Sequence, residues 1–314
     1  MRKKKKTLTL ILGFVLTFFV VFSGCEQAGD ERQSERTDMP WADTFELPFD
    51  RNIYNFSFLS PDAGWAVGER GLILAYKDNK WAIVKSPTEK HLFGVCFLDH
   101  DNAWAAGEDG VIVHWDGEEW NSIENPASRW ELMGISFTGP DDGWVVGFMG
   151  LIMHWGGEKW EIVSSPKPAH FMNVLFVNPD EGWATGAAGD ILHYKDNQWT
   201  EVSSPTKENL YGIYFSSPDD GWIVGAAGTI LRMEAGEWNV VNSPTEKHLM
   251  NVCFSNSDDG WIVGSAGTIL RYDGGDWEEY TSPTDKILYA VFLNETNMPW
   301  IAGKTRNIFR LSPT

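Results

Sequence analysis

Residues 249–283 read LMNVCFSNSDDGWIVGSAGTILRYDGGDWEEYTSP. This stretch contains four short apolar segments, at Leu249–Phe254, Trp261–Val263, Thr268–Tyr272 and Trp277–Tyr280, separated by clusters of Gly, Asp, Asn and Ser. Apolar residues alternate as in β-strands, and the clusters are typical turn sequences. Four short strands in a unit of about 39 residues, without helical periodicity, predict one blade of a β-propeller.

The same unit recurs along the chain, marked by two series of tryptophans. The first series, each preceded by a turn cluster, comprises Trp65, Trp104, Trp144, Trp183, Trp222, Trp261 and Trp300. The second comprises Trp41, Trp81, Trp120, Trp160, Trp199, Trp238 and Trp277. Seven members in each series predict seven blades, and we expect these fourteen large rings to form the core between blades.

The two ends of the repeat indicate how the ring closes. The last unit stops after its third strand, at residues 307–311. The unit before Ile53 is a lone fourth strand that contains Trp41, Phe45 and Leu47. An N-terminal strand that completes the last blade would pair the two chain ends and leave no large open edge. The sequence therefore predicts an all-β, seven-bladed propeller over residues 41–314, with four antiparallel strands per blade.

The residues before the propeller read as a targeting segment. Five positive charges at Arg2 and Lys3–Lys6 precede an apolar run of signal-peptide length, which ends in Phe22-Ser23-Gly24-Cys25. Small residues before a cysteine resemble the bacterial lipobox, which implies a signal peptide at residues 1–24 and a lipid on Cys25. A plain secretory signal or an uncleaved anchor is the alternative. Residues 25–40 are polar and read as a flexible tether. We expect a lipid-anchored protein of the cell envelope, on the extracytoplasmic face of a bacterial membrane.

The charge balance excludes one class of partner. The formal net charge is −19, and removal of the five positive charges of residues 1–24 lowers it to −24. Phosphate backbones repel such a chain, so we expect no nucleic acid partner. Beyond Cys25 the chain has two cysteines, Cys96 and Cys253, at the same register of different blades. Separate blades hold them too far apart to bridge, so we expect buried free thiols and no redox pair. We also expect the protein to be a monomer.

Three phrases carry a resemblance to a known family: Asp220–Gly225 (DGWIVG), Gly228–Leu231 (GTIL) and Asp273–Trp277 (DGGDW). They resemble the repeats of the photosystem II stability/assembly factor family and of related WD40/YVTN/BNR-like propellers. The resemblance covers nearly all of residues 41–314. It implies a seven-bladed propeller, an extracytoplasmic location, lipoprotein forms in bacteria and a role as a non-enzymatic assembly chaperone.

The turns between third and fourth strands also look like degenerate Asp-boxes, which sialidases carry. They depart from that pattern because the Asp stands four residues before the Trp and the usual Ser and Thr are absent. Sialidases also need an arginine cluster, a tyrosine nucleophile and an acid, and this chain has few arginines outside its repeat register. A glycan-binding or sialidase-like propeller is therefore the alternative function.

The predicted turns on one face of the propeller are strongly acidic. They hold 22 acidic residues against four lysines, whereas the loops of the other face mix both signs. Asp stabilises turns, so a solvated face is one interpretation. A surface for a basic partner or for Ca²⁺ is the other. No loop has the dense carboxylate spacing of a calcium loop, and we expect no metal and no cofactor.

At the end of the third strand, six of the seven units have a residue that can carry positive charge. The seven positions hold Ala75, His114, His154, His193, Arg232, Arg271 and Arg310. One interpretation is internal ion pairs with the acids of the preceding turns. The other is a cationic patch for an acidic partner segment or a carboxylate ligand. The assembly factor family has an arginine patch.

The third unit departs from the repeat on the less acidic face. Its entry loop is one residue longer than the others and holds Trp130, and its next loop carries Phe148 and Met149 where later units have Ala or Ser. A Trp, a Phe and a Met on loops of one face predict an exposed apolar anchor for a protein partner. The alternative is that Trp130 folds over the blade and covers Phe148.

These irregular residues suit contact better than catalysis. No unit breaks the repeat to place a nucleophile or an acid/base pair, as an enzyme would require. We therefore expect a non-enzymatic, envelope-anchored binding or assembly propeller that acts on an unidentified envelope protein. A structural lipoprotein without a small ligand is a third class that the sequence leaves open.

Overall fold

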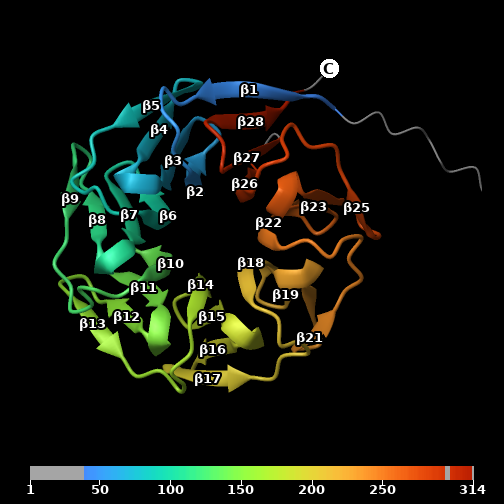
Figure 1. Ribbon diagram of the computed structural model, residues 1–314. Coiled ribbons are helices and arrows are strands. Elements are labelled where there is room, and N and C mark those ends of the chain that lie inside the picture. Colours follow the sequence, from blue (N-terminus) through green and yellow to red (C-terminus); the bar gives the residue numbers. More distant parts are fainter. Residues whose placement is uncertain (1–38, 294–297, 313–314) are drawn as a thin grey trace, which may run out of the picture. The chain divides into compact units, whose positions relative to one another are not determined.

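The computed structural model describes residues 39–293 and 298–312. The predicted signal peptide and Cys25 lie outside this range, as does the predicted tether except for Met39 and Pro40. Within it the chain forms seven four-stranded antiparallel sheets, arranged as blades around a central channel (Figure 1). The prediction of an all-β, seven-bladed propeller is confirmed. Among the described residues, no helix has the length and hydropathy needed to cross a membrane.

Each blade consists of an inner strand beside the channel, a second strand, a third strand and an outer strand, in that order. The inner strands of blades 1 to 7 are β2 (Ile53–Ser60), β6 (Leu92–Asp99), β10 (Leu132–Gly139), β14 (Phe171–Asn178), β18 (Leu210–Ser217), β22 (Leu249–Asn256) and β26 (Leu288–Leu293). The second strands are β3 (Ala63–Gly68), β7 (Asn102–Gly107), β11 (Asp142–Gly147), β15 (Glu181–Gly186), β19 (Asp220–Gly225), β23 (Asp259–Gly264) and β27 (Pro299–Gly303). The third strands are β4 (Ile73–Lys77), β8 (Ile112–Trp115), β12 (Ile152–Trp155), β16 (Ile191–Lys195), β20 (Ile230–Glu234), β24 (Ile269–Tyr272) and β28 (Asn307–Leu311). The outer strands are β5 (Lys80–Val84), β9 (Trp120–Ser122), β13 (Trp160–Val163), β17 (Gln198–Val202), β21 (Glu237–Val240), β25 (Trp277–Glu279) and, in blade 7, β1 (Trp41–Glu46).

The outer strand of blade 7 comes from the N-terminal side of the propeller. β1 pairs antiparallel with β28, so that Trp41 lies opposite Leu311, and the two strands run side by side at the ring closure (Figure 1). The backbone N–H of Leu47 donates to the carbonyl of Arg306 at 2.7 Å and extends this junction. The predicted closure by the two ends of the repeat is confirmed.

A short 3₁₀ turn joins the second and third strands of blades 1 to 6. The six turns are η1 (Glu69–Gly71), η2 (Glu108–Gly110), η3 (Phe148–Gly150), η4 (Ala187–Gly189), η5 (Ala226–Gly228) and η6 (Ser265–Gly267). We call the side of the ring that carries these turns and the loops leading into the inner strands the 3₁₀ face. The opposite side, formed by the turns between inner and second strands and between third and outer strands, is the hairpin face.

The hairpins corrected one expectation about the acidic residues. We expected Asp142, Glu181, Asp220 and Asp259 in the turns, but each is the first residue of a second strand. The reason is that the hairpin turn occupies only two residues, for example Ser257 and Asp258 between β22 and β23. These acids therefore belong to the strand ladder and face neighbours at a fixed register.

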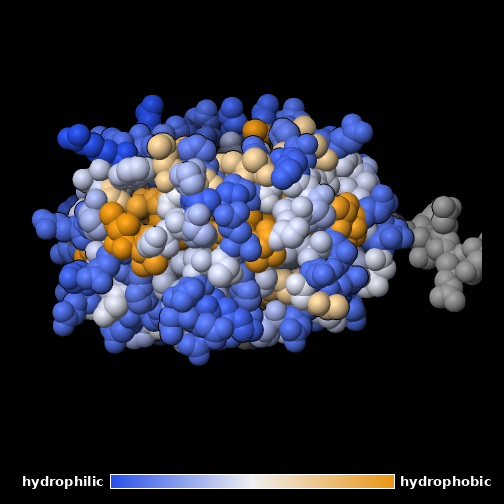
Figure 2. Space-filling model, turned by 90° about the horizontal axis from the view of Figure 1, so that it is seen from below, coloured by the Kyte–Doolittle hydropathy of each residue, from blue (hydrophilic) through white to orange (hydrophobic). Residues whose placement is uncertain are grey.

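The core lies between neighbouring blades. One cluster joins Trp300 of blade 7 to Phe56 and Trp81 of blade 1, and another joins Trp104 of blade 2 to Phe137 and Trp160 of blade 3. Viewed edge-on, hydrophobic side chains gather along the waist of the ring, while hydrophilic ones dominate both faces (Figure 2). Cys96 and Cys253 are both free thiols.

Candidate functional site

A layer of paired side chains lies behind the hairpin face. In blades 2 to 7 the His or Arg of the third strand stands directly opposite the Trp of the second strand, as His193 does opposite Trp183. Four of these basic side chains pair with the acid two residues before that Trp: His154 with Asp142 (2.7 Å), His193 with Glu181 (3.1 Å), Arg232 with Asp220 (3.4 Å) and Arg271 with Asp259 (3.5 Å). In blade 2, Asn102 replaces the acid, and its Oδ1 lies 2.9 Å from His114 Nε2 and accepts from Trp104 Nε1 at 2.8 Å.

The same cations also contact the tryptophan rings. The histidine rings lie 4.2, 4.3 and 3.9 Å from the rings of Trp104, Trp144 and Trp183. The guanidinium carbons of Arg232, Arg271 and Arg310 lie 4.9, 5.3 and 5.1 Å from the rings of Trp222, Trp261 and Trp300. We call this arrangement the acid–cation–Trp layer. Of the two interpretations left open by the sequence, its geometry is that of internal pairs, since each of the six side chains is held by neighbours in its own blade.

The predicted apolar anchor lies on the 3₁₀ face. Trp130 is 38% exposed and Met149 is 62% exposed. The backbone N–H of Phe148 donates at 3.1 Å to the carbonyl of Glu131, the residue after Trp130, so the two loops lie next to each other. Phe148 is only partly exposed and packs edge-on against His170 of blade 4, with ring centroids 4.7 Å apart. The structure therefore leaves two of the three predicted residues, Trp130 and Met149, available to a partner.

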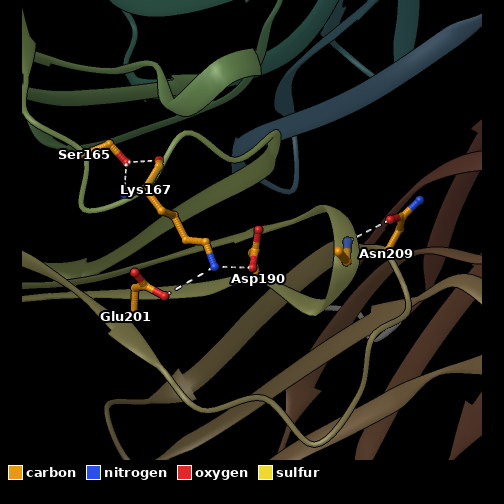
Figure 3. Close-up of polar contacts among 6 residues, drawn as sticks. Ser165, Lys167, Asp190, Glu201 and Asn209 are labelled. Atoms are coloured by element: carbon orange, nitrogen blue, oxygen red, sulfur yellow. Dashed lines mark hydrogen bonds and ion pairs between the residues drawn. The ribbon is translucent and has the colours of Figure 1, made fainter.

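The histidines near this face have structural partners. The Nδ1 atoms of His91, His170 and His248 accept the backbone N–H of the middle residue of the preceding 3₁₀ turn, at 2.9, 3.2 and 3.1 Å. Asn209 does the same for Ala188 through its Oδ1 (Figure 3). Each of these side chains thus fastens one blade to the next, and among the described residues no cluster of three metal-ligating side chains occurs.

Lysine contacts reinforce the same junction. Lys167, in the loop between blades 3 and 4, reaches Asp190 Oδ1 at 2.6 Å and Glu201 Oε2 at 3.3 Å (Figure 3). The hydrogen bond to Asp190 raises the pKa of Lys167. The anchor residues therefore sit on a 3₁₀ face whose loops are tied down by side-chain contacts.

A cavity of about 280 Å³ occupies the central channel, and the sequence pattern did not predict it. Every inner strand contributes its second residue to the lining: Tyr54, Phe93, Met133, Met172, Tyr211, Met250 and Tyr289. Asn55, Asn173 and Asn251 lie beside them. Burial raises the pKa of Tyr54 and Tyr289, so these phenols stay neutral. The sequence does hold a signal for this ring. The residue after the first buried residue of each inner strand recurs with the 39-residue period, and it is Tyr, Phe or Met in every blade.

Comparison with known proteins places these features in a family context. A family model described as "Photosynthesis system II assembly factor YCF48" matches residues 232–310. A structure titled "YCF48 bound to D1 peptide" is 20% identical, with a TM-score of 0.73, and the match covers 88% of this chain and 97% of that one. The family model covers residues 232–310 of the chain, and the similar structures share its propeller fold. A comparison with curated proteins finds no match.

Other solved structures share the propeller fold of this chain. YCF48 from Cyanidioschyzon merolae is 19% identical, with a TM-score of 0.70 and coverage of 87% of this chain and 99% of that chain. A streptogramin B lyase is 15% identical, with a TM-score of 0.79 and coverage of 88% and 98%. Since the propeller fold is shared between proteins with different activities, function has to be argued from the sites.

Proposed function

We propose that this chain is a non-enzymatic, envelope-anchored propeller that binds protein partners during assembly. Cys25 would carry the lipid anchor, and the 3₁₀ face would contact the partner. The proposal of a lipid anchor rests on the signal sequence. The proposal of a binding role rests on the exposed residues of the 3₁₀ face.

One observation carries the binding role: Trp130 and Met149 are exposed on neighbouring loops of one blade. Large apolar side chains at the centre of an interface supply most of its binding energy, and Trp is especially enriched there. Met adapts to irregular partner surfaces because its thioether chain is flexible and polarisable. His170 of blade 4 binds the turn that holds Met149, and Glu131 joins the Trp130 loop to the same turn. Both loops are therefore ordered before a partner arrives, and little conformational entropy is lost on binding.

The comparisons favour this class of function. The matched family model describes an assembly factor, and one of the similar structures is YCF48 bound to a peptide of D1. A relative that binds a peptide is consistent with a propeller that recognises protein segments. The aromatic and methionine ring of the central channel lies at the start of the inner strands, directly after the loops of the 3₁₀ face, and offers a further apolar surface.

The test is capture of envelope proteins by the full-length, tagged chain in its native membrane. We expect Trp130→Ala with Met149→Ala to lose the partners captured by the unchanged chain, because both anchor side chains are removed. The melting temperature should stay unchanged, since neither side chain is buried. Capture by chemical crosslinking, followed by quantitative mass spectrometry, measures the loss.

Two further variants make the result specific. Ile162→Ala removes a side chain that is 59% exposed on the outer strand of the same blade, and it should not change capture. Cys25→Ser tests the anchor, since the protein should then leave the membrane fraction. Unchanged capture by the Trp130/Met149 variant would contradict the binding role.

A further inference from the structure

Blade 1 lacks both polar members of the acid–cation–Trp layer. Trp65 occupies the tryptophan position and pairs with Ala75 across the strands, where other blades have His or Arg. Ala63 stands two residues before Trp65, where blades 3 to 6 have Asp or Glu. Blade 1 therefore lacks both partners of the ion pair, and no unpaired charge remains at these two positions.

The missing side chains leave a cavity of about 620 Å³ between blades 1 and 2, on the hairpin face. Trp65, Ala63 and Ala75 line its inner wall, together with Trp115 and Phe97 of blade 2. Trp65 is 5% exposed, whereas the arginine-covered Trp222, Trp261 and Trp300 are each 1% exposed. The site is thus a pocket bounded by an aromatic ring that nothing in its own blade covers with a cation.

A third alanine, Ala103, lies opposite Phe97, a residue in the wall of the same pocket. In blades 1 and 3 to 6 a glycine precedes the Trp, and the inner-strand Phe lies over it: a Cβ added at Gly143 would come within 2.2 Å of the Phe137 ring. Blade 2 has Ala103 at this position, which keeps Phe97 from lying there. Phe97 meets Trp65 edge-on, at 73° and 6.1 Å, whereas Phe137 stacks on Trp104 at 20° and 5.1 Å.

The rim of the pocket is acidic. Asp62, Asp78 and Asp101 line it, and in the described part of the chain none of the three takes part in an ion pair. One lysine, Lys77, also lines the pocket, and its side chain is exposed. Three carboxylates around an aromatic wall attract a cation, because the ring face and the carboxylates both carry negative potential.

We propose that this pocket binds the guanidinium group of an arginine in a basic segment of a protein partner. The proposal rests on the function proposed above and adds a second contact, on the hairpin face. Blades 5, 6 and 7 each hold a guanidinium 4.9 to 5.3 Å from the equivalent Trp ring, so the chain itself shows how the ligand would lie on Trp65. The carboxylates of Asp62 and Asp101 would replace the acid absent at Ala63.

Arginine fits this site better than lysine. A guanidinium is planar and weakly hydrated, so it stacks on an indole while its N–H groups remain free to donate to carboxylates at the rim. An ammonium is a compact, strongly hydrated ion that gains less from an aromatic wall. A peptide source is favoured over free arginine because the open acidic face can also contact the residues that flank the arginine.

The test uses the full chain in detergent micelles, labelled with fluorotryptophan and observed by fluorine NMR. The probe is an acetylated and amidated pentapeptide, Gly-Ser-Arg-Ser-Gly, with matched peptides that hold citrulline or lysine in place of the arginine. Trp65→Phe assigns the Trp65 signal. We expect the arginine peptide to shift this signal saturably, the lysine peptide to bind about fivefold more weakly, and the citrulline peptide and free arginine to give no saturable shift.

Variants of the pocket decide between specific binding and general attraction to an acidic face. Ala63→Asp with Ala75→Arg rebuilds the pair of blades 5 and 6, so it should abolish binding while the chain stays folded. Asp62→Asn with Asp101→Asn should weaken binding of the arginine peptide about tenfold. If the rebuilt variant does not fold, this second variant still tests whether the pocket binds arginine specifically. Asp180→Asn, at the position of Asp101 in blade 4, is the matched control and should have no effect.

The contrary outcomes are distinct. Equal shifts with the citrulline or lysine peptide, equal binding by free arginine, equal shifts of many tryptophans, or full binding by the Asp62/Asp101 variant would each overturn the proposal. Failure here leaves the envelope-capture result for Trp130 and Met149 intact, because that experiment concerns the opposite face. Conversely, a saturable pocket without captured envelope proteins would refute the proposed function and not the pocket.

Discussion

At the scale of single residues, burial governs the chemistry of the acid–cation–Trp layer. Burial lowers the pKa of His193, and the hydrogen bond to Glu181 opposes this shift without cancelling it. The ring stacks on Trp183 at 3.9 Å with an interplanar angle of 12°, so the imidazole serves as a packed aromatic as well as a polar partner. Arginine fills the same place in blades 5, 6 and 7, where it keeps its charge at any working pH.

The lowered pKa of His193 predicts an acid-sensitive contribution to stability. The unfolded chain, with a histidine pKa of about 6.5, binds more protons than the folded chain in mildly acidic solution. Stability should therefore be complete above about pH 7 and fall as the pH drops through about 6. We expect His193→Arg to reduce this fall, as measured by urea unfolding at both pH values.

The control for this prediction is Arg232→Lys, which changes the cation of an equivalent layer without adding or removing an imidazole. It should keep the pH dependence of the unchanged chain. An unaltered pH dependence in His193→Arg would show that the imidazole of blade 4 does not contribute.

At the scale of elements, each 3₁₀ turn is fixed by the loop that enters the following blade. Gly228, the last residue of η5, has φ of +71°, and a Cβ there would come within 1.8 Å of the carbonyl oxygen of Thr245. Gly236, in the hairpin of the same blade, has φ of +81°, but a Cβ added to it would meet nothing within 4 Å. An alanine at Gly236 would therefore meet backbone strain alone, whereas an alanine at Gly228 would meet backbone strain and a steric clash.

This pair gives a prediction for the blade junction. Gly236→Ala should cost about 1 kcal/mol of unfolding free energy, from the left-handed backbone alone. Gly228→Ala should cost about 3 kcal/mol, because the turn and the Thr245 loop must also move apart. Chemical denaturation of both variants measures the difference, and equal losses would show that the junction yields without strain.

Elements also show what the sequence could and could not predict. The tryptophan period predicted every blade, because two large rings per blade, one in the second strand and one in the outer strand, are a local, repeated requirement. It missed that Asp259 begins a strand, since a two-residue hairpin turn and a loop of Ser, Asp and Gly look alike in sequence. Once the turn is known, Asp259 and Arg271, twelve residues apart, become neighbours across two strands.

The same limit applies to the candidate sites. Trp130 and Met149 were identifiable because they break a repeat. The pocket at Trp65 was not, since it depends on three alanines at separate positions, each unremarkable alone. Ala63, Ala75 and Ala103 acquire meaning only when the register places them around one tryptophan.

At the scale of the whole molecule, ring closure links the chain ends to stability. β1 pairs with β28 of blade 7 and then continues into blade 1, so the chain from β1 to β2 crosses the junction between the last blade and the first. Blades 1 and 7 also pack directly: Phe58 stacks on Phe292 with ring centroids 4.4 Å apart, and Trp81 lies 6.0 Å from Trp300. Opening the ring at this junction therefore requires breaking both side-chain packing and the β1–β28 hydrogen bonds.

A circular permutant separates these two contributions. Moving residues 39–50 from the front of the propeller to the end, after residue 312, makes blade 7 continuous and keeps every strand pair. The junction of blades 7 and 1 is then held by side-chain packing alone, because no strand crosses it. We expect the permutant to form the same ring but to unfold at lower urea concentration than the unchanged chain. Amide hydrogen exchange in the permutant should be faster in β2 and β26, which flank the junction, than in β14 of blade 4. A permutant cut between blades 3 and 4, with the native ends joined, keeps the chain from β1 to β2 continuous across the junction of blades 7 and 1 and controls for the new termini. If both permutants lose the same stability, the shared seventh blade adds nothing beyond an uninterrupted chain.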